Sequence, residues 1–312
     1  MKLLTKTRLP GAIFALFMTG HCAVSEAATA DRPVSRYFAD VPAPAMEIHR
    51  GIKYVVPGTA QLMDIYMPEH VTGTLPAIVY IHGGGWLAGS RSSGEASAKH
   101  FTGRGYIFCS VDYRFSSEAI YPAQIEDCKC AIRYLRANAA QYHIDPAHIG
   151  AWGDSAGGHL VSLLGTTAHV AKLEGAGPWQ NESSAVQAVL DWYGPTDFDP
   201  KFFKEYTNAD GRRMMQQLLG SLDDTQLAAD ASPVTFVARG DPPFLIEQGD
   251  KDPLVPVSQS RALYDALKAV DDDVALKIIP GAGHGGGEFF TADNITMIDA
   301  FFDRVLKPAA PE

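Results

Sequence analysis

The feature that most constrains the fold of this chain is a sharp turn at residues 153–157, which read Gly-Asp-Ser-Ala-Gly. The apolar run at 148–152 before the turn predicts a strand, and the run at 158–164 after it predicts a helix. A strand-to-helix turn of this kind pushes the hydroxyl of Ser155 beyond the end of a sheet, where a histidine can reach it. A side chain on either flanking glycine would collide inside the turn. The pattern therefore predicts a serine nucleophile at a sheet edge.

A second motif lies upstream. Residues 75–81 read as a buried strand and run directly into the sequence His-Gly-Gly-Gly-Trp at 82–86. Acyl transfer builds negative charge on a carbonyl oxygen, and preorganised backbone N–H groups stabilise that charge. Successive glycines leave such groups unshielded. We therefore assign the oxyanion donors to the amides of Gly84, Gly85 and Ala156, the last being the residue after the nucleophile.

Strands and helices alternate along the rest of the chain, which predicts an α/β fold with a mostly parallel central sheet and helices on both faces. Strands are expected at 48–56, 62–66, 77–81, 107–111, 149–152, 186–192, 243–247 and 275–279, the first two antiparallel, and helices at 96–105, 122–140, 257–270 and 295–305. Residues 31–312 are expected to form one domain. Within it, residues 199–229 depart from the alternation, and we interpret them as a small lid over the active site.

Ligands of such sheets bind beyond the carboxyl ends of the strands. His284 follows the last expected strand in a glycine-rich loop, so it is the candidate general base that takes the proton of Ser155. Two candidates for the acid, Asp250 and Asp252, follow the strand before it, and spacing alone leaves both open. Asp154 adjoins the nucleophile and is interpreted as structural.

The first thirty residues have the layout of a secretory signal peptide. A basic start with Lys2, Lys6 and Arg8 precedes a short apolar core at 11–18, and Ala28-Thr29-Ala30 offers a small-x-small cleavage site. The apolar core is too short to span a bilayer. We therefore expect a secreted or periplasmic protein without stable membrane association.

The net charge of −10 argues against nucleic acid or an anionic membrane as a partner. Cleavage would leave Cys109, Cys128 and Cys130. The number is odd, so at least one thiol stays free, and the spacing offers no zinc site. A bridge from Cys109 to either of the other two is one alternative, and buried inert thiols are the other.

The two glycine motifs together resemble the HGGG class of α/β-hydrolase esterases, the hormone-sensitive-lipase-like group, and most closely its bacterial feruloyl-esterase-like branch, BD-FAE. The resemblance spans about Val55 to Val305 and includes Val-Asp-Tyr-Arg at 111–114, Trp-Tyr-Gly-Pro-Thr-Asp-Phe at 192–198, Ala-Ser-Pro at 231–233 and Gly-Asp-Lys-Asp-Pro-Leu-Val-Pro at 249–256. It implies the α/β-hydrolase fold. It also favours Asp252 over Asp250 as the acid, because residues 252–256 resemble the acid turn of the family.

One position departs from the family pattern. Residues 247–249 read Glu-Gln-Gly, where related chains commonly carry a histidine before the glycine. The local packing near the acid loop is therefore expected to differ from that of the family. His82 is expected to brace the oxyanion loop. Trp86, Tyr193 and Phe289 are candidates to line the substrate pocket, with plain core packing as the alternative for each.

The sequence thus predicts a secreted serine carboxylesterase with the triad Ser155, Asp252 and His284, which needs no metal or organic cofactor. The resemblance suggests feruloyl or acetyl esters of plant-wall sugars or phenolic acids, and generic short-chain esters fit equally well. The expected partner is a small-molecule or carbohydrate-linked ester. The rival predictions are an arylformamidase or peptidase on the same fold, and a non-catalytic binding module.

Overall fold

A computed structural model describes residues 45–55, 61–200 and 209–307. All of them belong to the second of the two units into which the chain divides, Arg32–Glu312. The expected signal peptide at 1–30 and part of the expected lid, 201–208, lie outside the described residues.

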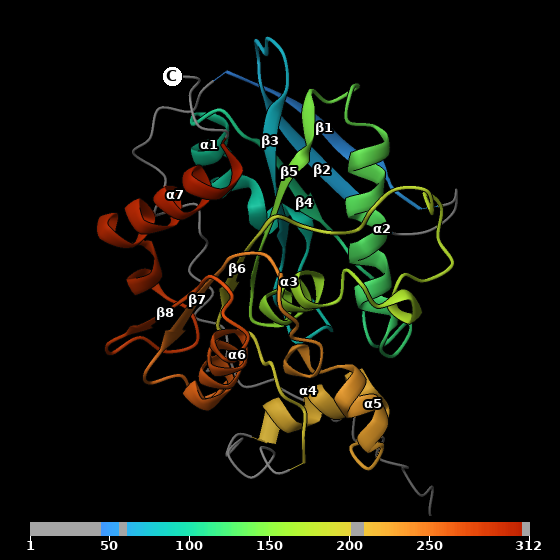
Figure 1. The fold of residues 1–312 in the computed structure, drawn as a ribbon, viewed down its shortest axis with the longest axis vertical. Coiled ribbons are helices and arrows are strands. Elements are labelled where there is room, and N and C mark those ends of the chain that lie inside the picture. Colours follow the sequence, from blue (N-terminus) through green and yellow to red (C-terminus); the bar gives the residue numbers. More distant parts are fainter. Residues whose placement is uncertain (1–44, 56–60, 201–208, 308–312) are drawn as a thin grey trace, which may run out of the picture. The chain divides into compact units, whose positions relative to one another are not determined.

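The described residues contain one eight-stranded sheet, and it confirms the predicted fold class (Figure 1). The strand order is β1-β2-β4-β3-β5-β6-β7-β8. Strand β2 pairs antiparallel with both of its neighbours, β1 and β4, and every other pair is parallel. The strands are β1 (Met46–Lys53), β2 (Leu62–Pro68), β3 (Leu75–Ile81), β4 (Ile107–Val111), β5 (Ile144–Asp154), β6 (Ala188–Trp192), β7 (Phe244–Gly249) and β8 (Val274–Ile279).

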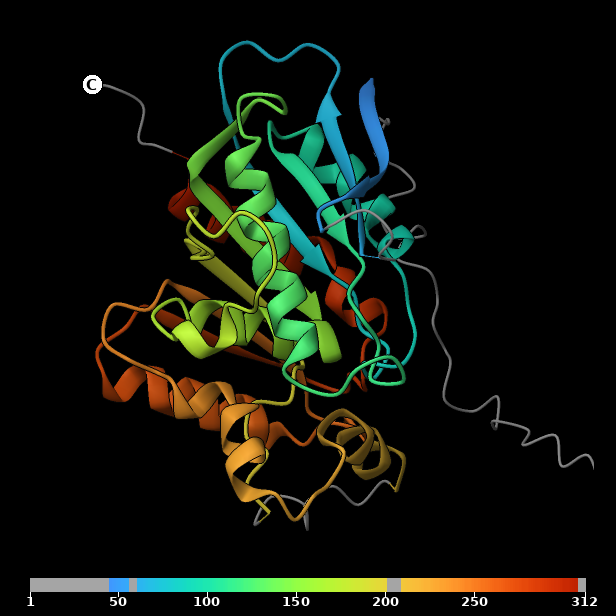
Figure 2. The same cartoon turned by 90° about the vertical axis from the view of Figure 1, so that its right-hand side faces the viewer.

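Helices cover both faces of this sheet (Figures 1 and 2). On one face lie α1 (Glu95–Thr102) and α7 (Ala292–Leu306); on the other lie α2 (Ala123–Ala137), α3 (Ala156–Thr166) and α6 (Val257–Ala269). Because the central strands are buried on both sides, they read as continuous apolar runs. Strand β3 is an example, with all of its residues after Leu75 buried.

Each face has its own apolar cluster. Beneath α1 and α7 the cluster is rich in aromatic rings, and Phe101 lies within 6 Å, centroid to centroid, of Phe108, Trp152 and Phe302. On the other face, the side chains at 125, 128, 132 and 135 of α2 are all buried, as their helical spacing predicts. Cys109, Cys128 and Cys130 are free and buried, so the alternative of a disulfide is wrong.

The described residues between β6 and β7 include the α-helices α4 (Ala209–Leu219) and α5 (Thr225–Asp230). They lie below the sheet in Figure 1, at the end where the parallel strands finish. This is the location expected for the lid. Among the described residues, no helix has the length and apolar character needed to cross a membrane.

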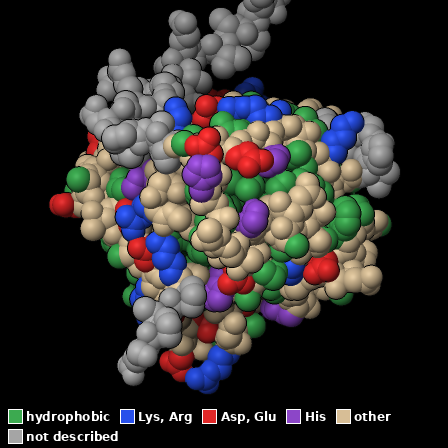
Figure 3. All heavy atoms as spheres, turned by 90° about the horizontal axis from the view of Figure 1, so that it is seen from above, with side chains coloured by type: hydrophobic (Ala, Val, Ile, Leu, Met, Phe, Trp, Pro, Cys, Tyr) green, Lys and Arg blue, Asp and Glu red, His purple; other side chains and the backbone are tan. Residues whose placement is uncertain are grey.

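The opposite end of the sheet carries the connection from β2 to β3. Figure 3 shows the molecule from above the view of Figure 1. Charged and histidine side chains are interspersed there with apolar ones. No extended patch of basic side chains covers the described part of this face.

Candidate active site

The strand-to-helix turn holds Ser155 in a strained conformation. Ser155 lies between β5 and α3 with φ +54° and ψ −117°, and its N–H donates to the carbonyl of Trp192 at 2.8 Å. A Cβ atom on Gly157 would lie 1.9 Å from the carbonyl oxygen of Ile81, and one on Gly153 would lie 2.3 Å from a backbone oxygen inside the turn. Glycine is therefore required on both sides, as the sequence predicted.

The structure brings Ser155, His284 and Asp252 together from three loops. The Nε2 atom of His284 lies 2.7 Å from Ser155 Oγ, and its Nδ1 atom lies 2.7 Å from Asp252 Oδ2. An ionised carboxylate only accepts hydrogen bonds, so Nδ1 carries the proton and Nε2 is free to accept the serine proton. The three side chains have the hydrogen-bond order of a serine nucleophile, its base and the group that orients the base.

The geometry also separates the two acid candidates. The Asp252 side chain is fully buried, and its Oδ1 accepts from the backbone N–H groups of Leu254 and Val255 at 2.8 and 2.9 Å. Asp250 instead accepts from the N–H of Gly281 at 2.7 Å and fixes the loop that leads to the histidine. Of the two aspartates, Asp252 is the one that contacts His284.

The expected oxyanion loop follows β3. Gly84 has φ +115° and Gly85 has φ +61°, both in the region that favours glycine. Within the described part of the chain, the amides of Gly84, Gly85 and Ala156 have no protein acceptor, whereas the Gly83 amide donates to Asp154 Oδ1 at 3.1 Å. The loop therefore offers two unpaired donors, and the first residue of α3 offers a third.

Two buried side chains support this loop. Asp154 accepts from Tyr80 Oη at 2.6 Å as well as from Gly83, and burial raises the pKa of its carboxyl group. His82 donates from Nδ1 to the carbonyl of Gly83 at 2.7 Å and stacks on Tyr113, with ring centroids 4.6 Å apart. Burial lowers the pKa of His82, so its imidazole stays neutral and serves as a brace.

His159 links the oxyanion loop to the residue that follows α5, a role that the sequence did not reveal. Its Nδ1 accepts from Trp86 Nε1 at 3.2 Å, and its Nε2 donates to the carbonyl of Ala231, just after α5, at 2.7 Å. Full burial lowers the pKa of His159 to about 4. Nothing in the local sequence distinguishes this histidine from an ordinary surface or core residue, and no local pattern marks its two partners.

For Trp86 and Phe289 the burial in this structure favours core packing over a place in the substrate pocket. Trp86 is 3% exposed and Phe289 is 0% exposed, so neither presents a surface to a substrate. Trp86 packs against His159 and Phe198, and Phe289 packs behind Tyr193. Tyr193 is also largely buried, at 7% exposed, but its ring lies edge-on to His284 with centroids 4.7 Å apart. It remains a candidate to contact a substrate.

A contact from the lid was also missed. A Cβ on Gly85 would lie 2.5 Å from Met214 Sδ, so the thioether of this α4 residue lies directly against the oxyanion loop. No local pattern in the sequence of the lid predicts this contact.

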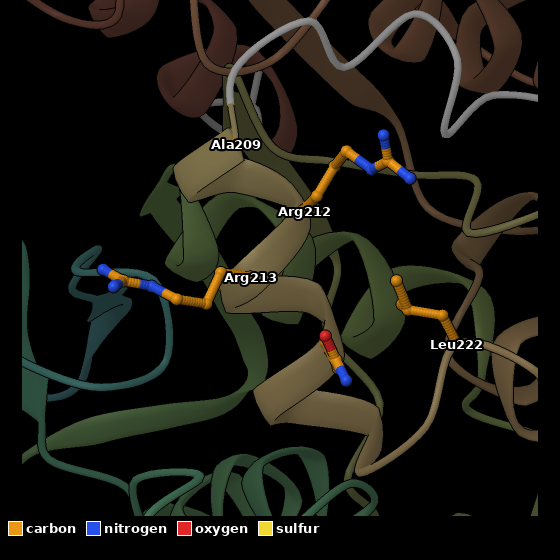
Figure 4. A pocket seen from close by; sticks show the side chains of 5 residues that line it. Ala209, Arg212, Arg213 and Leu222 are labelled. Atoms are coloured by element: carbon orange, nitrogen blue, oxygen red, sulfur yellow. The ribbon is translucent and has the colours of Figure 1, made fainter.

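The outer side of α4 carries a shallow hollow of about 300 Å³. Figure 4 shows that the side chains of Arg212 and Arg213, which line it, point in different directions. None of the triad residues borders this hollow. Within the described ranges, no group of three or more His, Cys, Asp or Glu side chains is arranged to hold a metal ion.

Several known proteins that are similar to this chain are esterases. The BD-FAE family model matches residues 63–267. Esterase LipC of Mycobacterium tuberculosis is 33% identical over 232 residues, which is 72% of this chain and 57% of LipC. The chain thus matches little more than half the length of that relative.

Two solved structures match over nearly their whole length. A truncated carbohydrate esterase from gut microbiota has a TM-score of 0.74 and 31% identity, and the match covers 84% of this chain and 99% of that one. Esterase 2 of Thermogutta terrifontis, phosphonylated by sarin, has a TM-score of 0.73 and 27% identity, with coverage of 86% and 98%.

Proposed function

Because this chain belongs to the BD-FAE family of α/β-hydrolase esterases, we propose that it is a serine carboxylesterase acting through an acyl-enzyme on Ser155. One observation carries the proposal: a single imidazole lies within hydrogen-bond distance of both the Ser155 hydroxyl and the buried carboxylate of Asp252. A serine hydroxyl is a weak nucleophile until a positioned base takes its proton, and His284 is such a base.

In the acylation step, Ser155 Oγ attacks the ester carbonyl while His284 Nε2 takes the hydroxyl proton. The oxygen of the tetrahedral intermediate gains negative charge, which the unpaired amides of Gly84, Gly85 and Ala156 stabilise. His284 then returns the proton to the departing alcohol. Asp252 holds the imidazole tautomer and stabilises the imidazolium without taking the proton.

Deacylation repeats this chemistry with water as the nucleophile. His284 takes a proton from the water as it attacks the acyl carbonyl, and the same amides hold the second oxyanion. Collapse of this intermediate releases the carboxylic acid and restores the Ser155 hydroxyl. The proton and charge are balanced by residues of this chain alone.

The proposed substrates are short-chain or aryl acyl esters, including acyl groups on carbohydrate. The likeness to a carbohydrate esterase supports the carbohydrate-linked class. The contact of Met214 with the oxyanion loop supports a short or flat acyl group, because it restricts the space beside Gly85. The sequence of residues 1–30 supports secretion.

A substrate panel tests the proposed function. We expect p-nitrophenyl acetate, methyl ferulate or acetylated xylan to be hydrolysed, and the activity to be lost in Ser155→Ala. N-formylkynurenine and dipeptide amides cover the rival arylformamidase and peptidase. Turnover of N-formylkynurenine or a dipeptide amide without turnover of any ester would reject a carboxylesterase. Turnover of no compound at all would also reject it.

Labelling with a fluorophosphonate separates an enzyme from a binding module. Such a probe phosphonylates only an activated serine, and the related esterase from T. terrifontis has been phosphonylated by sarin. We expect rapid labelling of the wild-type protein and none of Ser155→Ala. A binding module would react no faster than the variant.

A further inference from the structure

The position where the sequence departs from the family pattern lies directly behind the catalytic acid. Gln248 is the next-to-last residue of β7 and is 0% exposed. Its Nε2 donates to Asp252 Oδ2 at 2.9 Å, the same oxygen that accepts from His284 Nδ1. Neither the acylation step nor the deacylation step uses the Gln248 side chain.

The orientation of the Gln248 amide is fixed by its other contacts. Ser260 Oγ, on α6, donates to Gln248 Oε1 at 2.9 Å, and Nε2 also lies 3.2 Å from the carbonyl oxygen of Val255. A flipped amide would place its oxygen against the carboxylate and against that carbonyl, two groups that only accept. A continuous chain of hydrogen bonds therefore runs from Ser260 through Gln248, Asp252 and His284 to Ser155.

We propose that Gln248 is a positioning residue that fixes the Asp252 carboxylate and shares its negative charge, and so tunes the strength of His284 as a base; the role in turnover rests on the proposed function. With Gln248 present, the two oxygens of Asp252 accept four hydrogen bonds, which is their full capacity. The amide is neutral and does not titrate, so this support is the same at every pH.

Loss of this donor should move the pH profile in one predictable direction. Without Gln248 Nε2, more of the carboxylate charge on Oδ2 acts on His284, and the imidazolium form is favoured. His284 then keeps its proton up to a higher pH. The acid limb of the reactivity profile therefore moves to higher pH, and the carboxylate loses its fixed orientation. The other titratable groups that face His284, namely Asp154 and Tyr193, are unchanged.

The test compares two buried glutamines. Gln248→Met removes the donor and keeps the length of the side chain. Gln259→Met is the matched control, because Gln259 is also 0% exposed and accepts from the amides of Thr196 and Asp197, both at 2.8 Å. A third variant, Gln248→His, restores a ring N–H donor at the same position.

Three quantities are measured for each variant against pH: the rate of fluorophosphonate labelling, kcat/KM for p-nitrophenyl acetate, and the low-field proton NMR signal of the His284–Asp252 hydrogen bond. For Gln248→Met we expect about tenfold to a hundredfold slower labelling and turnover, the range of a charge-assisted hydrogen bond. We also expect the acid limb and the NMR titration to move to higher pH. Gln259→Met lowers the melting temperature without moving either profile, and Gln248→His regains most of the rate.

Wild-type profiles and rates in folded Gln248→Met would overturn the proposal, as would an equal movement of the profiles in Gln259→Met. The NMR titration separates this result from the fate of the proposed function. If the wild-type protein hydrolyses no ester but the His284 signal titrates at higher pH in Gln248→Met, the esterase assignment fails and the positioning role stands.

Discussion

The two sides of this active site are held in different ways. On the acid side, four hydrogen-bond donors converge on the carboxylate of Asp252: two backbone amides and the side chains of Gln248 and His284. On the oxyanion side, Asp154 and His82 hold only Gly83 by hydrogen bonds. Apolar contacts lie beside the next residues of the loop, where Met214 lies against Gly85 and the Trp86 ring packs on Phe198. Ser155 lies between the two sides.

The difference matches what each side must do. A base has to be aimed at one proton within a fraction of an ångström, and directional hydrogen bonds supply that precision. A substrate pocket has to fit an acyl or alcohol group, and van der Waals contacts with a flexible thioether can adapt to that group. We therefore expect changes on the acid side to reduce the rate for every substrate, and changes at the lid to alter the choice of substrate.

The largest effect is expected from the acid itself. Asp252→Asn should lower kcat by about 10⁴-fold, because the amide can favour the wrong imidazole tautomer. Asp250→Asn is the control, since Asp250 accepts from the Gly281 amide and does not contact His284, and it should change kcat by less than about tenfold, the scale of one exposed hydrogen bond. A larger loss at Asp250 would reverse the assignment. Steady-state kinetics with one ester gives the answer.

The next largest effect is expected at the oxyanion loop. A Cβ on Gly84 would lie 2.2 Å from the carbonyl oxygen of Ala88, so Gly84→Ala must move the loop and its donors. We expect kcat to fall by about 10²–10³-fold, the cost of losing one donor. Gly73 also has a positive φ, and a Cβ added there would have nothing within 4 Å, so Gly73→Ala controls for backbone strain alone. Equal kcat losses in both variants would contradict the donor role.

The free energy of unfolding should depend on pH through Glu247, the buried neighbour of Gln248 on the Asp252 side of the active site. Burial raises its pKa from 4.5 to about 7, so the folded state favours the protonated form. This contribution to stability is present below pH 4.5 and is lost as the pH rises through 7. The loss amounts to about 3 kcal/mol at most.

Glu247→Gln removes the group that ionises, so it should raise the free energy of unfolding at pH 9 and have little effect at pH 5. Glu69→Gln, at an exposed position, is the control and should be neutral at both values. Urea unfolding at the two pH values measures the difference. A Glu247→Gln effect of the same size at pH 5 and pH 9 would show that ionisation is not its cause.

The smallest effect is expected at the lid. Met214→Ala should open space beside Gly85 and raise kcat/KM for bulky acyl groups relative to acetate by about tenfold, the lower end of what one pocket contact contributes. The adjacent Met215 is 1% exposed, so Met215→Ala should lower the melting temperature without changing this ratio. An unchanged ratio in Met214→Ala would place the acyl pocket elsewhere.

The sequence was informative where a short local pattern decides the geometry. The glycines around Ser155 and at 84–85 are required by close backbone approach and positive φ, and these needs are visible in the residues themselves. The strands were predictable because central parallel strands are continuously apolar. His284 and Asp252 each follow a parallel strand, and the carboxyl ends of parallel strands meet at the same edge of the sheet.

The sequence was uninformative where long-range packing decides the role of a side chain. Trp86 and Phe289 are aromatic residues close in sequence to catalytic motifs, and only the fold shows that both are buried. Gln248 and His159 act through partners on other elements, and Met214 through a contact with a loop 129 positions earlier. No local spacing encodes such contacts.

The central claim is that both sides of the site converge on Ser155. A crystal structure of the protein after reaction with a fluorophosphonate tests this most directly. We predict phosphorus bonded to Ser155 Oγ and the phosphonyl oxygen about 3 Å from the amide nitrogens of Gly84, Gly85 and Ala156. Phosphorus on another residue, or a phosphonyl oxygen turned away from these amides, would contradict the account.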